Sequence, residues 1–398
     1  MTVPNQEELW LHCETLLTPF KRHEDCVLHI AAGRIDQILT SGQHRNVPES
    51  LVVHQPGAVA VPGLIDVHVH GAGGRDVMEG TLDALQTISA TLARYGTTSF
   101  LATTVSASDL ETSGVLRSIG ENRDRVTAGA VLLGIHMEGP YINPLRRGTH
   151  QPEFLKQAAV REFRRFVELS ENTVRKITLA PEMDPGLRVT HAASAAGIQV
   201  FLGHSDATFD QAKAAIAAGA QGATHLFNAM RPFHQREPGI LGMALIDEAV
   251  YAEIIIDGIH VHPAALRLLL RAKEIERVML VTDGTSAVGM PDGSYRLGGR
   301  TISVSEGECR DSEGNLAGST LTLDRALRYL VSRMDLPLGD AVSAATASPA
   351  RSLGIAGRKG IVGLGADADL VFLDDNLSVI KTIVGGRVVY SREETTKG

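Results

Sequence analysis

The chain has 398 residues, of which 43% are hydrophobic and 21% are charged, and its formal net charge is −8. This charge disfavours extensive nucleic-acid binding, and three cysteines are too few for a disulfide-stabilised secreted scaffold. No apolar run approaches the roughly 20 residues of a membrane span, and the first residues, MTVPNQEELW, lack a basic and then apolar leader. We therefore expect a cytoplasmic protein with one large and one small domain.

Short β-rich segments stand at both ends of the chain. VLHIAAGRIDQIL contains two strand-like runs around a Gly-Arg turn, and DADLVFLD and IKTIVGGRVVYS repeat this style near the C-terminus. Because these segments flank a long α/β middle, we predict one small β-sandwich domain formed by residues 1–60 together with 360–398.

The middle of the chain, residues 61–359 of the predicted catalytic domain, alternates apolar runs with helical patterns. Eight runs are typical of buried parallel strands, and they lie at 59–70, 97–104, 130–139, 177–182, 198–205, 222–228, 251–258 and 278–284. Eight such βα units predict an α/β fold of the (β/α)₈ TIM-barrel type. An open doubly wound sheet is the alternative, but no GxGxxG motif follows the first strand.

Five of these runs end in side chains that bind metals or transfer protons. The strand ends of a barrel meet on one face, so these groups are expected to converge; they are His68, His70, Glu138, His204, His225 and Asp283. Mixed histidine and carboxylate ligands suit Zn²⁺, Fe²⁺, Mn²⁺ or Co²⁺. Such a metal lowers the pKa of bound water to about 7, and Asp283 is a candidate acceptor for the proton. Each group also has a plainer explanation, such as a helix N-cap for Asp283.

The motifs HVHGAGG, HMEGPYINPLRRGTHQP, GHSDAT, THLFNAM, DGIH and VTDG, in this order, resemble the N-acetylglucosamine-6-phosphate deacetylase family of the amidohydrolase superfamily. The likeness covers nearly the whole chain, and it includes PGLIDVHVHG and GADADLVFLD, which resemble the superfamily more widely. It implies metal-dependent hydrolysis of the acetamide of N-acetyl-D-glucosamine 6-phosphate to D-glucosamine 6-phosphate and acetate, a step of amino-sugar metabolism.

The resemblance also implies a metal-ligand set. Glu138, His204 and His225 would hold the principal ion. Some relatives lack the HxH pair and keep one metal, whereas this chain has both His68 and His70 and so resembles the members that can hold a second ion.

Further roles follow from the same resemblance. Asp283 corresponds to the catalytic acid/base, and His150 in RRGTHQP to a residue that hydrogen bonds and polarises the substrate carbonyl. The positions that would contact the sugar phosphate are Asn228, Ala229, Arg236, His260, Leu316, Ala317 and Gly318. Plainer explanations exist here too, since Arg236 suits a solvated loop and His260 lies just before a helix start at Pro263. In the family some contacts come from a neighbouring subunit, which implies a homodimer.

Two other functions stay open at this point. The first is a different amidohydrolase, such as an N-acyl amino-acid deacylase or a cyclic amidase, which would need no phosphate site. Subclasses that use a carboxylated lysine are disfavoured, because the fourth run, ITLAPE, has no lysine at its end. The second is a catalytically inactive barrel used as a scaffold, which is disfavoured because the implied ligands are all present.

Overall fold

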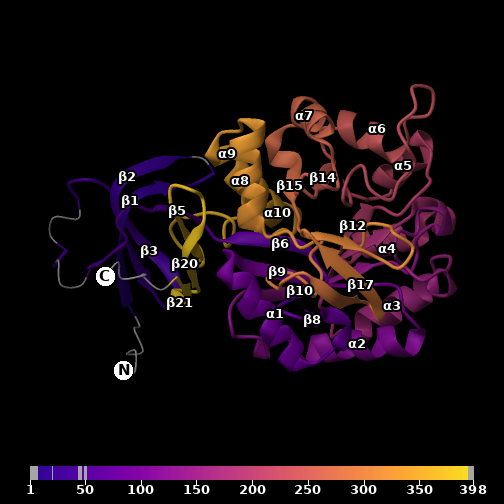
Figure 1. Ribbon diagram of the computed structural model, residues 1–398, viewed down its shortest axis with the longest axis horizontal. Helices are drawn as coiled ribbons and strands as arrows, with labels where there is room; N and C mark the ends of the chain where they lie inside the picture. The colour runs from indigo at the N-terminus through magenta and orange to yellow at the C-terminus, as the bar shows by residue number, and fades with distance from the viewer. Residues whose placement is uncertain (1–7, 20, 44–46, 49–51, 393–398) are drawn as a thin grey trace.

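The computed structural model describes residues 8–19, 21–43, 47–48 and 52–392. The rest of the predicted terminal domain, at 1–7, 20, 44–46, 49–51 and 393–398, lies outside the described residues. Figure 1 shows a β-rich body, built from both ends of the chain, to the left of a larger α/β body. Within the described residues, no helix has the length and apolar character needed to cross a membrane.

The larger body is a parallel barrel, as predicted. Its strands lie side by side in chain order: β6 (Leu64–Val69), β9 (Thr97–Thr104), β10 (Val131–Glu138), β11 (Val174–Leu179), β12 (Gln199–Leu202), β13 (Gly222–Ala223), β14 (Tyr251–Ile254) and β15 (Val278–Leu280). Beyond β15 the chain returns to β6, where the Asp283 N–H donates to the His68 carbonyl at 2.9 Å. The His70 N–H likewise donates to the Gly284 carbonyl at 2.7 Å, so the ring closes beside the two histidines.

Helices connect the strands and cover the outside of the barrel (Figure 1). They are α1 (Leu82–Arg94), α2 (Asp109–Asn122), α3 (Val160–Leu169), α4 (Arg188–Ala195), α5 (Phe209–Ala217), α6 (Gly239–Ile246), α7 (Pro263–Ala272), α8 (Leu323–Met334), α9 (Leu338–Ala345) and α10 (Ala347–Ser352). Helix α1 shows how the local sequence determines where a helix begins and which side is buried. The Thr81 side chain accepts from the Ala84 N–H and caps the helix. Its Leu85, Ile88 and Leu92 recur at helical spacing and are buried.

Strands from both chain ends form one continuous sheet of eight strands among the described residues, in the order β21-β20-β19-β5-β1-β2-β3 with β4 beside β1. They are β1 (Glu8–Leu17), β2 (Arg22–Ala31), β3 (Arg34–Leu39), β4 (Val52–His54), β5 (Val59–Pro62), β19 (Leu370–Leu373), β20 (Val379–Val384) and β21 (Arg387–Ser391). Strand β5 joins the two halves, because it pairs parallel with β1 and antiparallel with β19. The fold class is thus confirmed, while the boundaries at residues 60 and 360 stay a prediction.

The apolar run at 59–70 is divided between the two bodies instead of forming one strand. β5 belongs to the terminal sheet and β6 to the barrel, and Gly63 lies between them. A Cβ at Gly63 would stand 2.1 Å from the Thr98 hydroxyl oxygen, so only glycine fits where the chain changes sheets. Apolar character continues across the break because residues on both sides are buried.

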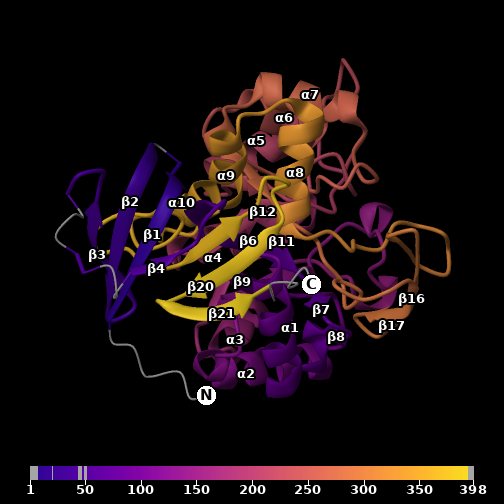
Figure 2. The ribbon, with the colours of Figure 1, turned by 60° about the vertical axis from the view of Figure 1, so that its left-hand side comes forward.

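A small antiparallel sheet follows β15 that the sequence reasoning did not predict. It consists of β16 (Gly293–Leu297), β17 (Arg300–Ser305) and β18 (Glu308–Arg310), and Figure 2 shows β16 and β17 at the right-hand edge of the molecule. A shorter hairpin, β7 (Gly71–Ala72) with β8 (Arg75–Asp76), comes directly after His70. Single 3₁₀ turns lie at Val77–Glu79, Arg123–Arg125, Pro144–Arg146, Pro152–Phe154, Pro181–Met183, Pro185–Leu187 and Ile275–Arg277.

Candidate active site

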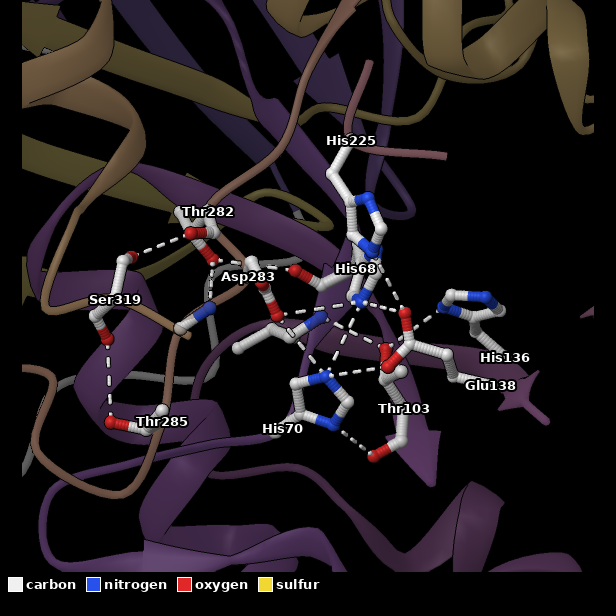
Figure 3. Close-up of polar contacts among 12 residues, drawn as sticks. His68, His70, Thr103, His136, Glu138, His225, Thr282, Asp283, Thr285 and Ser319 are labelled. Atoms are coloured by element: carbon white, nitrogen blue, oxygen red, sulfur yellow. Dashed lines mark hydrogen bonds and ion pairs between the residues drawn. The ribbon is translucent and has the colours of Figure 1, made fainter. Parts of the chain in front are cut away.

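The six candidate ligands meet at the C-terminal ends of the barrel strands. Glu138 is the last residue of β10, while His204 and His225 each follow a strand by two positions. His204, His225 and Asp283 all have positive φ, at 47°, 31° and 49°. Side chains other than glycine rarely adopt this backbone region, and such residues gather at functional sites. Figure 3 shows His68, His70, His225, Glu138 and Asp283 pointing toward a common centre.

The Glu138 carboxylate lies in the middle of this cluster. Its Oε1 is 3.3 Å from His204 Nε2 and 3.2 Å from His225 Nε2, and these two nitrogens are 3.0 Å apart. Glu138, His204 and His225 therefore form one compact group of potential metal ligands, and all three are buried.

A second group adjoins the first. His68 Nε2 and His70 Nε2 are 3.3 Å apart, and Asp283 Oδ1 lies 3.5 Å from the former and 3.1 Å from the latter. Glu138 also reaches this group, since its Oε1 is 3.3 Å from His68 Nε2 and its Oε2 is 3.3 Å from His70 Nε2. The carboxylate is thus close enough to both groups to bridge two ions.

Neighbouring acceptors fix how three of the histidine rings present their nitrogens. Nδ1–H of His70 donates to the Thr103 carbonyl at 3.2 Å, and Nδ1–H of His204 donates to the Arg146 carbonyl at 2.9 Å. His68 Nδ1 lies 3.4 Å from a carboxylate oxygen of Glu253. Carbonyl and carboxylate oxygens only accept, so one ring proton stays on Nδ1 and Nε2 is the nitrogen that faces the centre. This is the usual arrangement of a metal-bound histidine.

The buried carboxylates of the cluster favour positive charge beside them. Burial lowers the pKa of His68, but the carboxylates of Glu138 and Asp283 outweigh it and raise that pKa to about 9. Burial likewise lowers the pKa of His70, and hydrogen bonds to Asp283 and Glu138 raise it to about 10. Two buried carboxylates therefore hold positive charge among these nitrogens, as protons or as a metal ion. Inward-facing Nε2 atoms that exchange a proton for a metal, beside two carboxylates, fit a divalent transition metal.

His150 stands beside the cluster as a neutral hydrogen-bond donor. The Ser106 backbone N–H donates to His150 Nδ1 at 3.1 Å, which leaves the ring proton on Nε2. That Nε2 is 3.3 Å from Glu138 Oε2. Burial lowers the pKa of His150 to about 4 although Glu138 opposes the shift, so the ring is neutral near pH 7.

A cleft of about 280 Å³ opens onto the ligand cluster. Among the residues expected to contact substrate, His150, Asn228, Ala229, His260, Leu316 and Gly318 line it. His260 is oriented by Asp257, whose Oδ2 lies 2.6 Å from His260 Nδ1. The adjacent His262 instead caps α7 by accepting from the Ala264 N–H, so the helix-start explanation applies to His262.

Two expected substrate contacts lie elsewhere. Arg236 is on an exposed loop and does not line the cleft, and the side chain of Ala317 is fully buried. The sequence reasoning missed Arg146, Thr149 and Leu297, which line the cleft. Leu297 lies at the end of β16, and the Gly298-Gly299 pair that follows it was an overlooked hairpin signal.

The chain is similar to known proteins over most of its length. The model of the amidohydrolase family matches residues 59–389. An N-acetylglucosamine-6-phosphate deacetylase of Vibrio furnissii is 41% identical over 83% of this chain and 82% of its own length. An N-acetylgalactosamine-6-phosphate deacetylase of Escherichia coli O157:H7 is 37% identical over 95% of this chain and 98% of its own. A mutant N-acetyl-D-glucosamine-6-phosphate deacetylase of Mycobacterium smegmatis, solved with N-acetyl-D-glucosamine-6-phosphate, superposes with a TM-score of 0.90 at 35% identity, covering 97% of this chain and 100% of that one.

Proposed function

Because the chain belongs to the amidohydrolase family and, within it, to the N-acetylglucosamine-6-phosphate deacetylases, we propose that it hydrolyses the acetamide of N-acetyl-D-glucosamine 6-phosphate. The products are D-glucosamine 6-phosphate and acetate. The observation that carries this proposal is the convergence of Glu138, His204 and His225 with Asp283 at the floor of one cleft.

Glu138, His204 and His225 hold the principal ion in this proposal, and His68 and His70 hold a second one, with Asp283 at its edge. Zn²⁺, Fe²⁺, Mn²⁺ and Co²⁺ all suit these donors. When bound, such an ion lowers the pKa of water to about 7 and polarises a carbonyl.

In this proposal Asp283 transfers protons, and His150 stabilises the negative charge that develops on the substrate. Burial raises the pKa of Asp283, but His68 and His70 outweigh it and hold that pKa at about 2, so the carboxylate is ionised. It accepts the proton of the attacking water and then passes it to the leaving amine. The Nε2–H of His150 donates to the acetamide oxygen as negative charge develops there.

The sugar phosphate lies farther out in the cleft. Asn228 and Ala229 lie on the loop after β13, His260 lies on the loop after β14, and Leu316 and Gly318 line the same cleft. Gly318 has φ +57°, and a Cβ there would stand 2.7 Å from the Asp283 carbonyl oxygen, so glycine lets this segment pack against the catalytic residue.

Arg236 supplies a charged, forked donor for the phosphate. Its exposed position outside the cleft suits a contact that forms across a subunit boundary. We therefore include a homodimer in the proposal, and we assign the enzyme to the cytoplasm, consistent with its three free cysteines.

The C4 epimer is the second candidate substrate. It is favoured by the relative of Escherichia coli O157:H7 that acts, by its name, on N-acetylgalactosamine 6-phosphate and matches 95% of this chain. Parallel assays of acetate release from the two epimeric 6-phosphates separate the candidates. A higher kcat/KM for the gluco epimer supports our proposal, and a higher value for the galacto epimer replaces it with the second candidate.

A further inference from the structure

Beneath the ligand cluster the barrel interior contains an ion pair that the proposed chemistry does not use. Lys176 on β11 and Glu253 on β14 are 1% and 0% exposed, and the Lys176 ammonium contacts Glu253 Oε1. The other oxygen, Oε2, lies 3.4 Å from His68 Nδ1. Replacing a buried pair of this kind with apolar residues is often neutral or stabilising. Stability alone therefore explains its presence poorly.

We propose that Glu253, held in place by Lys176, is a positioning residue for His68. It keeps the proton on Nδ1 and sets the direction of the ring, so that Nε2 serves the ion site formed by His68, His70 and Asp283. The inference rests on the proposed function in one respect, namely that this second group of ligands holds a metal ion.

The contacts around His68 support this role. Among the described residues, the only side chain with a hydrogen bond to His68 Nδ1 is Glu253. Asp66 accepts instead from the His68 backbone N–H, at 3.2 Å. The Nδ1 atoms of His70 and His204 hydrogen bond to backbone carbonyls, and Nδ1 of His225 has no hydrogen-bond partner within the described residues. Among the described residues, His68 is therefore the only one of these ligands whose Nδ1 hydrogen bonds to a charged side chain, and such partners raise the basicity of the ligand.

Lys176 determines which oxygen of Glu253 is available. An ammonium group only donates, so the oxygen that faces it must accept. The Lys176 ammonium also lies 3.5 Å from the Val67 carbonyl and 4.7 Å from the centre of the Phe201 ring, so its position is fixed from two sides. A carboxylate accepts at both oxygens, and Glu253 can thus serve Lys176 and His68 at once.

This geometry gives Glu253→Gln a specific effect. A glutamine has one accepting oxygen, and Lys176 takes it, so the amide NH₂ group turns toward His68. Facing a donor, His68 Nδ1 must accept, and its proton moves to Nε2, where it blocks metal binding. Replacing Lys176 by methionine in the same chain frees the amide to rotate and restores the accepting oxygen to His68.

The test measures zinc stoichiometry and affinity by equilibrium dialysis and elemental analysis of the full-length chain. Wild type is expected to bind two ions. In Glu253→Gln, the affinity for one ion is expected to stay within about 3-fold of wild type. The affinity for the other ion is expected to fall about 10- to 100-fold, the usual effect of losing the hydrogen-bond partner of a metal-bound histidine. The double variant, Glu253→Gln with Lys176→Met, is expected to regain most of the lost metal affinity. Lys359→Met is the matched control, because it breaks another buried lysine–carboxylate pair, with Asp369, the residue that precedes β19.

Three results would overturn the proposal: one ion in wild type, equal weakening of both ions in Glu253→Gln, or no recovery in the double variant. If Glu253→Gln does not fold, Glu253→Asp is measured instead. Its shorter side chain can stay with Lys176 but withdraws from His68, so the same selective loss is expected. Because stoichiometry is measured without substrate, an enzyme that binds two ions yet deacetylates neither sugar phosphate contradicts the proposed function alone.

Discussion

Asp283→Asn is expected to remove catalysis while leaving the principal metal group intact. Asparagine has nearly the same shape as aspartate and tolerates the positive φ of 49° at this position, so the backbone should not move. Asp283 is not part of the Glu138, His204 and His225 group. The substitution removes the proton acceptor, which corresponds to about a 10²- to 10⁴-fold loss in kcat, or about 2.7–5.5 kcal/mol of transition-state stabilisation.

The assay is acetate release over a range of substrate concentrations, together with the metal content of the purified variant. We expect kcat to fall as stated, KM to stay within about 3-fold, and at least one ion per chain to remain. Asp335→Asn is the matched control, because Asp335 has a similar φ of 56° on an exposed surface. An unchanged kcat, or a metal-free variant, would refute the assignment of Asp283 as the acid/base.

Other substitutions and conditions test separate parts of the site. His150→Gln should lower kcat about 10²- to 10³-fold at unchanged metal content, because a donor to the developing oxyanion is lost; an unchanged kcat would contradict this role. Arg236→Ala should raise KM for the 6-phosphate substrate, and an equal effect on the unphosphorylated sugar would argue against a phosphate contact. Metal affinity should increase with pH, because His68 and His70, with pKa values of about 9 and 10, carry protons at neutral pH that a metal must displace. Titrations at pH 6.5 and 7.5 should differ about 10- to 100-fold for one to two protons released, and equal affinities would refute the account.

The sequence was sufficient to predict the barrel and the convergence of the candidate ligands, because both depend on local pattern. Parallel strands are largely apolar, and each of the six candidate ligands lies at or close to the end of such a run, as Glu138 does at the end of β10. The small domain was predictable for a similar reason, since it contains strands that alternate in burial, as β1 does over Glu8–Cys13.

Local sequence pattern could not predict contacts between segments that lie far apart in the chain. Glu253 reads as one polar residue within an apolar run, and only closure of the barrel brings it to His68, 185 positions away. Lys176 was passed over because it lies inside the fourth strand and not at its end. Arg146 orients His204 through its backbone carbonyl, which no side-chain motif could reveal.

The most direct test of the account is acetate release from N-acetyl-D-glucosamine 6-phosphate beside the unphosphorylated sugar, before and after removal of metal by a chelator. The account predicts rapid turnover of the phosphate ester alone, abolished by chelation and restored when a divalent transition metal is added back. Turnover that survives complete metal removal, or equal turnover of both sugars, would contradict it.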